Sequence, residues 1–427
     1  RKFDWPVYGF DKARTHYLPL SRPFRPPFGE RWSIRRPTLL EFTPSLGGRS
    51  LFLLKNNAAL YGVTRKTGKR RWKRKLGHLA ASTPAYAHGT VYATILLRGK
   101  GTKGGRVVAV SAKSGRTRWS RRLPSRTESS PLIDRGTLYF GTENGTVYAL
   151  RATDGAVRWR HRAKGAVKGA IALEERTGRL YFGDYSGAVT ALRKRDGRML
   201  WRKSTSGTRF GLGSGNFYAT PAVAFGRVFI GNTDGNVYSF SARNGALAWR
   251  KKTSGYVYAS AAVAHVPGGR PTVYVGSYDG TFYALDARSG RVRWSRKAEG
   301  RISGGATILG DLVFYSTLNH HTTALGAVTG RKVWMTRRGA FHSVVSDGRG
   351  IFLNGFTNIF GIDGRPPRAR PKPRGKVKVG HRVRYHGHRH RRRGDPPRCH
   401  RHGHHKRRGG RVIRYTHIHC HRHLRRR

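Results

Sequence analysis

Short runs that alternate between apolar and polar residues, each bounded by a glycine-containing turn, recur along most of the chain. Residues 130–133, 137–141, 146–150 and 156–159 form one such set. Short runs rich in Val, Tyr, Phe and Thr, separated by Gly, Asn and Asp, are typical of antiparallel strands joined by tight turns. The pattern therefore predicts a repeating unit of four short antiparallel strands.

Tryptophan marks the period of this unit. Apart from Trp5, successive tryptophans are 40 to 48 residues apart, and seven of them follow a small polar residue and a glycine. The eight positions are Trp32, Trp72, Trp119, Trp159, Trp201, Trp249, Trp294 and Trp334. A repeat of about 40 to 45 residues with four strands is typical of the blades of a β-propeller. We expect these tryptophans to pack as core between neighbouring blades.

The two ends of the repeat region predict how the ring closes. Residues 343–346, 351–354 and 358–362 supply three strands after the last complete unit, and residues 28–34, with Trp32, supply one strand before the first. Joined together they make an eighth blade and leave no unpaired sheet edge, which would promote aggregation. The sequence thus predicts an all-β, eight-bladed propeller at residues 28–364, between a lead-in at 1–27 and a tail at 365–427.

These features resemble the pyrroloquinoline-quinone (PQQ) type of propeller repeat, which ends in Gly-x-x-x-Trp after a strand such as Gly-x-Val-Tyr-Ala-Leu. The chain has Gly-Thr-Val-Tyr-Ala-Leu at 145–150 and Gly-Thr-Phe-Tyr-Ala-Leu at 280–285. The lead-in sequence Asp-Trp-Pro-Val-Tyr-Gly at 4–9 is also similar to the entry of such proteins. The resemblance, over residues 4–364, implies the fold and no single activity, because the family includes quinoprotein dehydrogenases and the outer-membrane assembly lipoprotein BamB.

The resemblance to quinoprotein dehydrogenases implies a set of residues that the sequence can be searched for. Those enzymes hold the quinone between a tryptophan and a disulfide of adjacent cysteines, beside a calcium ion bound by Glu, Asn and Asp. This chain has only Cys399 and Cys420, which are not adjacent and lie outside the propeller. Several of its few carboxylates, such as Asp154 and Asp196, stand in predicted turns, where they cap backbone amides. We therefore expect no catalytic residue and no cofactor, with a calcium- and PQQ-dependent dehydrogenase as the alternative.

Charge changes the picture, because the chain has 86 Lys and Arg against 20 Asp and Glu, a formal net charge of +66. Many cations flank the predicted fourth strands, as at residues 69–75 and 116–122, and fourth strands form the circumference of a propeller. Lysine and arginine on an edge strand prevent edge-to-edge pairing, but that role does not require so large an imbalance. The surplus favours contact with a polyanion, such as an anionic envelope polymer, lipid headgroups or nucleic acid bound without sequence specificity.

Propellers usually bind ligands on the face where their innermost strands begin. The residues that enter these strands are mostly cationic or aromatic, which suits an anionic or glycan-like ligand through hydrogen bonds and ring stacking. Ordinary loop decoration is the alternative interpretation. The predicted ligand-binding residues are Arg126, Lys168, Tyr218, Tyr256, Tyr258, Arg301 and His342.

The tail at 365–427 contains 24 Lys and Arg, 12 His and one acid, with few large apolar residues. It cannot form a core, so we expect it to be disordered on its own. Alternating histidines beside a cysteine can bind zinc, nickel or copper, since these metals prefer imidazole and thiolate donors. The candidate ligands are His388, His390, Cys399, His417, His419 and Cys420. Adhesion to a polyanion and a tail with no selected role are the alternatives.

Together these patterns predict a non-catalytic binding or scaffolding module that is secreted or associated with the cell envelope. Its expected partner is an anionic envelope polymer or a protein, and the alternative functions are BamB-like protein assembly and quinoprotein catalysis. No apolar run reaches the length of a membrane span, about 18 residues. Because the chain begins with Arg1, we expect that an export signal or anchor preceded it.

Overall fold

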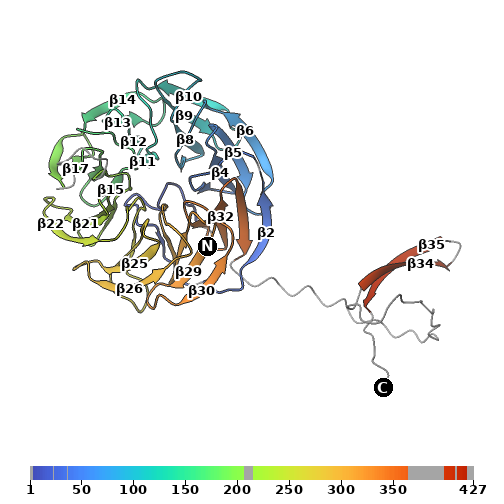
Figure 1. Ribbon diagram of the computed structural model, residues 1–427. Helices are drawn as coiled ribbons and strands as arrows, with labels where there is room; N and C mark the ends of the chain where they lie inside the picture. Colours follow the sequence, from blue (N-terminus) through green and yellow to red (C-terminus); the bar gives the residue numbers. More distant parts are fainter. Residues whose placement is uncertain are drawn as a thin grey trace. The chain divides into compact units, whose positions relative to one another are not determined.

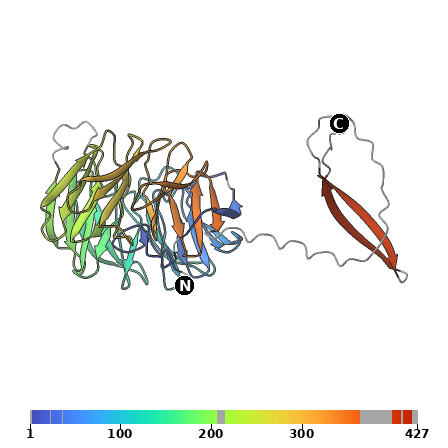
Figure 2. The same ribbon diagram turned by 90° about the horizontal axis from the view of Figure 1, so that it is seen from below.

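The computed structural model describes residues 3–22, 24–35, 37–205 and 215–363 with their side chains, and the backbone of residues 399–408 and 411–420. Within these residues the chain forms strands and no helix, so no helix there could cross a membrane. Figure 1 shows the strands of the larger part as a ring of blades, and Figure 2 shows that ring from the side. The predicted all-β propeller of eight blades is confirmed.

Each blade is a meander of four antiparallel strands that begins at the centre of the ring and ends at its circumference. In the third blade, β11 (Leu132–Asp134) pairs with β12 (Thr137–Gly141), β12 with β13 (Thr146–Arg151), and β13 with β14 (Val157–Arg162). The inner strands are mostly buried because they lie between neighbouring blades, and they are rich in Val, Leu, Tyr and Phe. The fourth strand alternates between exposed and half-buried residues. The predicted four-strand unit is therefore confirmed.

The other complete blades repeat this order from the inside outwards. The first two consist of β3 (Ser45–Gly47), β4 (Ser50–Leu54), β5 (Ala59–Thr64) and β6 (Arg70–Lys75), and of β7 (Ala85–Ala87), β8 (Thr90–Ile95), β9 (Arg106–Ser111) and β10 (Thr117–Arg122). The fourth and fifth consist of β15 (Ala172–Glu174), β16 (Arg179–Gly183), β17 (Ala188–Arg193) and β18 (Met199–Ser204), and of β19 (Ala222–Ala224), β20 (Arg227–Gly231), β21 (Asn236–Ser241) and β22 (Leu247–Lys252). The sixth and seventh consist of β23 (Ala262–Ala264), β24 (Thr272–Gly276), β25 (Thr281–Asp286) and β26 (Val292–Lys297), and of β27 (Thr307–Leu309), β28 (Leu312–Ser316), β29 (Thr322–Gly326) and β30 (Lys332–Thr336).

The eighth blade is made from both ends of the repeat region. Its inner strands are β31 (Val344–Ser346), β32 (Gly350–Gly355) and β33 (Asn358–Asp363), and β2 (Gly29–Ile34) pairs antiparallel with β33 as the outermost strand. Trp32 of β2 is paired with Gly361 of β33, as Trp72 of β6 is paired with Gly62 of β5. The predicted closure of the ring by the Trp32 strand is thus confirmed.

The repeated glycine and tryptophan hold neighbouring blades together. The indole N–H of each outer-strand tryptophan from Trp32 to Trp294 donates to a backbone carbonyl of the next blade, at 2.8–3.2 Å. The turn glycine of that next blade lies on the indole ring: at Gly115, where φ is +71°, a Cβ atom would lie 2.7 Å from the ring of Trp72. The glycine of each Gly-x-x-x-Trp motif therefore packs against the tryptophan of the preceding blade, which explains why both residues recur with the same period.

The lead-in crosses the centre of the ring, a path that the sequence did not predict (Figure 1). The backbone N–H groups of Leu173, Val223, Val263 and Ile308, in the innermost strands of the fourth to seventh blades, donate to carbonyls of residues 12, 13, 15 and 16 at 2.7–2.9 Å. Residues 3–6 make similar backbone contacts with the eighth, first and second blades, and β1 (Tyr17–Leu18) pairs parallel with β27. The lead-in therefore ties the inner strands together.

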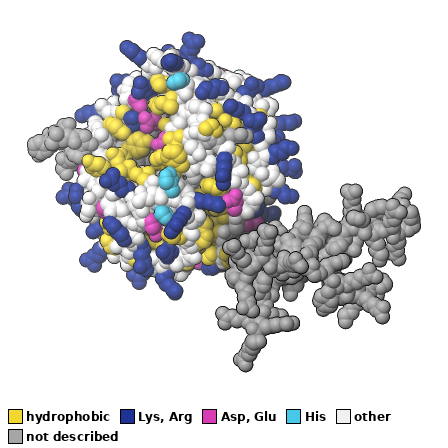
Figure 3. Space-filling model, turned by 45° about the vertical axis from the view of Figure 1, so that its right-hand side comes forward, with side chains coloured by type: hydrophobic (Ala, Val, Ile, Leu, Met, Phe, Trp, Pro, Cys, Tyr) yellow, Lys and Arg dark blue, Asp and Glu magenta, His cyan; other side chains and the backbone are white. Residues whose placement is uncertain are grey.

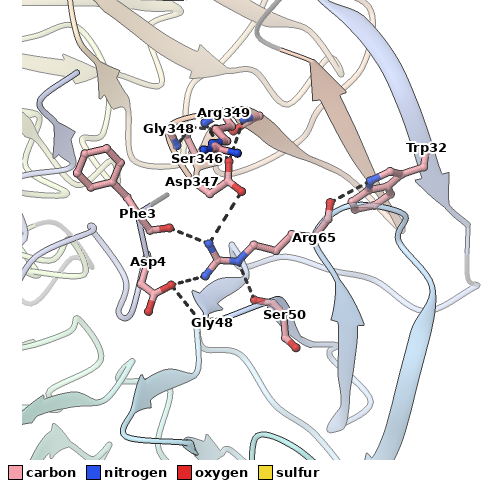
Figure 4. Close-up of polar contacts among 11 residues, drawn as sticks. Phe3, Asp4, Trp32, Gly48, Ser50, Arg65, Ser346, Asp347, Gly348 and Arg349 are labelled. Carbon is pink, nitrogen blue, oxygen red and sulfur yellow. Dashed lines mark hydrogen bonds and ion pairs between the residues drawn. The ribbon is translucent and has the colours of Figure 1, made fainter. Parts of the chain in front are cut away.

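Arg65 joins the lead-in to the first blade and to the eighth blade, in which the ring closes (Figure 4). Its side chain is only 4% exposed, and it donates from Nε to the Ser50 carbonyl at 3.2 Å and from Nη1 to the Phe3 carbonyl at 2.7 Å. Nη2 donates to the carboxylate of Asp4, and Nη1 lies 3.9 Å from Oδ2 of Asp347 in the eighth blade. One guanidinium thus connects the lead-in with the first and eighth blades.

The chain divides into a unit at Arg1–Arg370 and a second unit at Pro371–Arg427. In the second unit, β34 (Cys399–Arg408) and β35 (Arg411–Cys420) form an antiparallel hairpin. The sequence predicted a tail that is disordered on its own, and these two strands are the part of that tail that the structure describes. The β-branched and aromatic residues between 412 and 418 favour a strand even in so polar a segment.

Candidate functional site

A cavity of about 230 Å³ lies at the centre of the ring, on the face where most of the innermost strands begin. Its aromatic lining consists of Tyr8, Phe42, Tyr218, Tyr258, Tyr278 and Phe341, and its ionisable lining also includes Glu41, Glu128, Lys168 and His342. These residues come from the lead-in and from five or more blades, so only the closed ring assembles them. A cavity of this size accommodates a small molecule or one side chain of a partner.

The lead-in supplies the floor of the cavity. The Tyr8 hydroxyl donates to Oγ of Ser260 at 3.0 Å and lies 3.4 Å from Nδ1 of His342. Arg14 is fully buried and holds this segment by donating to the carbonyls of Tyr8 and Ile171, at 2.5 and 2.9 Å. Burial raises the pKa of Tyr8 to about 12 and lowers the pKa of His342 to about 4. At neutral pH the floor therefore carries no charge from these two side chains.

Tyrosine rings form one wall of the cavity and its mouth. The rings of Tyr218 and Tyr258 meet edge to face with centroids 5.8 Å apart, and Tyr258 meets Tyr278 in the same way at 4.9 Å. Tyr256 is 50% exposed, and its ring centroid lies 5.8 Å from that of Tyr258. Cζ of Arg301 lies 5.9 Å from the centroid of Tyr278, a cation–π contact. The mouth therefore presents aromatic faces that already attract one cation.

Two carboxylates neutralise Lys168 in the cavity wall. Its Nζ lies 2.9 Å from Oε1 of Glu128, 3.2 Å from Oε1 of Glu143, and 5.3 Å from the ring centroid of Tyr185. Burial alone would lower the pKa of Lys168, but the hydrogen bond to Glu128 and the nearby negative charges outweigh it and raise that pKa. An anionic ligand at Lys168 would have to compete with carboxylates that are already in place.

Glu41 is the second carboxylate that lines the cavity. Its Oε2 accepts a hydrogen bond from Nδ2 of Asn56 at 3.0 Å, and among the residues that the structure describes no lysine or arginine forms an ion pair with it. Burial raises the pKa of Tyr218 well above its ordinary value, and the charges of Glu128 and Glu41 raise it further. The negative charges of both carboxylates therefore act on the hydroxyl of Tyr218.

The structure brings most of the predicted face residues together. Lys168, Tyr218, Tyr258 and His342 line the cavity, and Tyr256 and Arg301 touch its tyrosine wall. Arg126 is exposed and does not line the cavity.

Sequence reasoning missed Tyr8, Glu41 and Tyr278. Tyr8 stood in the Trp-Pro-Val-Tyr-Gly motif of the lead-in, which marked the family resemblance but not a position in the ring. Glu41 lies in the segment between β2 and β3, and Tyr278 lies in the turn between β24 and β25; only their place beside the cavity gives them a role.

The circumference carries a surplus of exposed cations. In β6, with the sequence Arg-Arg-Trp-Lys-Arg-Lys, every residue except Trp72 is exposed. The outer strands β10, β14, β22 and β26 each carry three Lys or Arg, whereas β30 carries only Lys332. Figure 3 shows Lys and Arg side chains, in dark blue, projecting around the outline of the ring.

The cavity residues do not match a site for calcium and a quinone. A hard cation is held by several converging oxygen ligands. Of the two lining carboxylates, Glu128 is paired with Lys168, and Glu41 accepts a hydrogen bond from Asn56. Within the described ranges, no group of three or more His, Cys, Asp or Glu side chains could hold a metal ion. The wall therefore lacks the donor set that the quinoprotein alternative requires.

The predicted metal ligands of the tail fall into two groups. His388 and His390 lie outside the described residues. In the hairpin, the backbone register places Cys399 opposite Cys420, His400 opposite His419, and His402 opposite His417. Because alternate residues of a strand belong to the same face, both histidine pairs fall on one face of the hairpin and the cysteine pair on the other.

A closed ring of four-stranded blades with a cavity at its centre defines this molecule as a β-propeller. The family model described as outer membrane protein assembly factor BamB matches residues 56–266 and 233–355. This match covers more than half of the chain, which therefore belongs to that BamB-like family of PQQ-type propellers. The resemblance noted in the sequence is confirmed. No curated protein matches the chain.

Solved structures share this fold at low sequence identity. Quinohemoprotein alcohol dehydrogenase ADHIIG from Pseudomonas putida HK5 is 14% identical with a TM-score of 0.71, over 87% of this chain and 82% of that one. BamB from Moraxella catarrhalis is 15% identical with a TM-score of 0.61, over 79% and 97%. The computationally designed Ika8 protein is 13% identical with a TM-score of 0.65, over 78% and 99%. At such identities the similarity shows the fold alone.

Proposed function

We propose that this protein is a non-catalytic binding or scaffolding module that acts outside the cytoplasm, at the cell envelope. It binds its partner on the channel face, which is the face of the ring where most of the innermost strands begin. The observation that carries this proposal is the cavity of about 230 Å³, with its fixed floor and tyrosine wall. Concave sites lined by aromatic side chains and a few ionisable groups are typical of ligand binding. Lys168, Tyr218, Tyr258 and His342 contact the ligand inside, and Tyr256, Arg301 and Arg126 supply the surface around it.

A protein partner fits this face better than a large free ligand. The cavity is too small for more than one side chain or small group, while the half-exposed Tyr256 and the exposed Arg301 extend the contact surface around it. Tyrosine and arginine are enriched among the residues that dominate binding energy at protein interfaces. The family description, an outer membrane protein assembly factor, supports assembly of envelope proteins as the more specific form of this function.

The circumference supports a second contact, with an anionic envelope polymer. Exposed lysines and arginines recur on the outer strands of successive blades, so an extended polyanion meets one cationic strand after another. Binding of this kind depends on phosphate or carboxylate charge and falls steeply with salt. Nucleic acid would bind there in the same non-specific way.

Quinoprotein catalysis is the enzymatic alternative. The pairing of Glu128 with Lys168 speaks against it, because it withdraws a carboxylate from any calcium site in the cavity. The test is to add the quinone together with calcium and to record absorbance and dehydrogenase activity. A stoichiometric quinone complex that requires calcium would overturn the non-catalytic proposal.

The binding proposal is tested by capture from an envelope extract on three forms of the full chain. Tyr218→Ala/Tyr258→Ala removes two rings of the cavity wall, and Arg116→Ala/Arg118→Ala removes two exposed cations beside β10 as the matched control. We expect one defined protein to stay bound to the wild type and to the arginine variant in about 1 M NaCl, where the Debye length is about 3 Å. The tyrosine variant should lose it. Equal capture by all three forms would refute a face site.

A further inference from the structure

We propose that the cavity on the channel face binds an organic cation, an alkylammonium group such as the end of a lysine side chain on a partner protein. This inference rests on the proposed function of the face as a ligand site, and it names the chemistry of the group that enters. The sequence had favoured an anionic or glycan-like ligand there, because it showed the cations of the face without their partners.

The charges around the cavity favour a cation. Glu128 and Glu143 share Lys168, at 2.9 and 3.2 Å, so one ammonium faces two carboxylates. Glu41 adds a third carboxylate, and no cation within the described residues pairs with it. Residues 1–364 hold 62 Lys and Arg against 19 Asp and Glu, so most acids have a cation to pair with. Glu41 also lines the cavity, so its carboxylate is placed to pair with a cation that arrives with the ligand.

The aromatic wall provides the second contribution. Ring faces attract a cation electrostatically, most strongly where water is excluded. Two such contacts exist already, between Nζ of Lys168 in the cavity wall and the ring of Tyr185 at 5.3 Å, and between Cζ of Arg301 at the mouth and the ring of Tyr278 at 5.9 Å. Tyr258 lies inside this group, with its ring edge to face against the rings of its neighbours, and it lines the cavity. An alkylammonium group between these rings and Glu41 makes the same two kinds of contact that Lys168 already makes, one with a carboxylate and one with a ring face.

The floor does not oppose a cation. His342 is the ring in the lining that would carry a positive charge if protonated, and burial lowers its pKa to about 4. The Tyr8 hydroxyl, 3.4 Å from Nδ1 of His342, is neutral and donates to Oγ of Ser260. Arg14 lies behind this floor with its N–H groups directed to backbone carbonyls, so it does not line the cavity. A cation entering from the face therefore meets hydroxyls, ring faces and carboxylates, and the ammonium of Lys168 in the lining is already paired with Glu128 and Glu143.

Four small probes test the sign of the ligand on the full chain by ligand-observed NMR titration in about 0.15 M NaCl, where long-range repulsion by the propeller is screened. N-butylammonium and the amide of N-acetyl-lysine carry the cation, 1-butanol is the neutral counterpart, and butyrate is the anionic one. We expect saturable binding of both cations and none of the other two at the same concentration. A tighter complex with the lysine derivative indicates a partner side chain, and a tighter complex with butylammonium indicates a free amine.

Variants locate the binding in the cavity. Glu41→Gln and Tyr258→Leu should each weaken butylammonium binding by about threefold to thirtyfold, the range expected for one charge or one ring face. Tyr258→Phe keeps the ring and should bind nearly as the wild type does. Thermal unfolding of each variant confirms that it is folded. Unchanged affinity of Glu41→Gln and Tyr258→Leu would overturn the assignment of the cavity.

The outcomes separate this inference from the proposed function on which it rests. Binding of butyrate in place of the two cations would overturn the cation assignment and leave a face site for an anionic ligand. If no probe binds but Tyr218→Ala/Tyr258→Ala still loses the captured protein, the cation assignment falls and the face site stands. If no probe binds and capture is also unchanged, both fail.

Discussion

The Arg65→Ala substitution removes the side chain that connects the lead-in to the first and eighth blades. In the folded chain its guanidinium donates to the carbonyls of Phe3 and Ser50, contacts Asp4, and lies 3.9 Å from Asp347. With alanine at this position the carboxylate of Asp347, which is 7% exposed, stays buried without its cation. The ring should therefore lose stability at the point where its two ends meet.

The size of the effect follows from burial. Removing one partner of a buried ion pair costs about 3–5 kcal/mol. The carboxylate of Asp4 is 45% exposed, so water replaces its contact with Arg65 at little cost, and we take the lower end, about 3 kcal/mol. An unfolding entropy of about 2 cal/mol/K per residue over roughly 360 residues converts this loss into a fall in Tm of about 4 °C.

Differential scanning calorimetry of the full chain measures this fall. Arg49→Ala is the control, because it removes an exposed cation near the same turn, and its Tm should stay within about 1 °C of the wild type, as is usual for surface substitutions. Arg65→Lys keeps the positive charge but loses the planar guanidinium with its several N–H donors, so its Tm should lie between those of the wild type and Arg65→Ala. A Tm of Arg65→Ala equal to that of Arg49→Ala would refute the role of Arg65 at the closure.

Three further predictions concern buried and metal-binding groups. Burial lowers the pKa of His342 to about 4 and that of His16 to about 3. As the pH falls from 6.5, the ordinary histidine pKa, toward these values, the unfolded chain takes up protons that the folded chain does not. The stability present above pH 6.5 should therefore fall by about 2 kcal/mol per histidine at pH 5, and less in His342→Asn, as measured by chemical denaturation at pH 8 and pH 5. Burial alone would raise the pKa of Asp134, but hydrogen bonds from two lysines outweigh it and lower that pKa, so Asp134→Asn should be less stable than the wild type at pH 7, and the difference should shrink as the pH falls below about 4 through the lowered pKa; a difference that does not shrink on acidification would contradict this. The full chain should bind zinc in isothermal titration, and His417→Ala/His419→Ala should lower the affinity by at least about tenfold; an unchanged affinity would exclude these two ligands.

The sequence was sufficient for the architecture because the contacts that build a blade are local. Each strand pairs with the next one along the chain, and the glycine turns and alternating residues that specify this pairing stand within a few residues of each other. The closure by the Trp32 strand also followed from the count of strands at the two ends. The lead-in carries no such period, and its backbone bonds go to strands as distant as Ile308, so its path across the ring had no local signal.

The composition of the cavity wall depended on the ring itself. Sequence reasoning identified Lys168, Tyr218, Tyr258 and His342 because they precede innermost strands, which is a local property. It could not show that Lys168 is neutralised by Glu128 and Glu143, nor that Glu41 completes the wall, since electrostatic partners are set by distance in space. Strand order was thus determined by the chain alone, whereas the charges and rings that surround the cavity were brought together only when closure placed side chains from different blades around one axis.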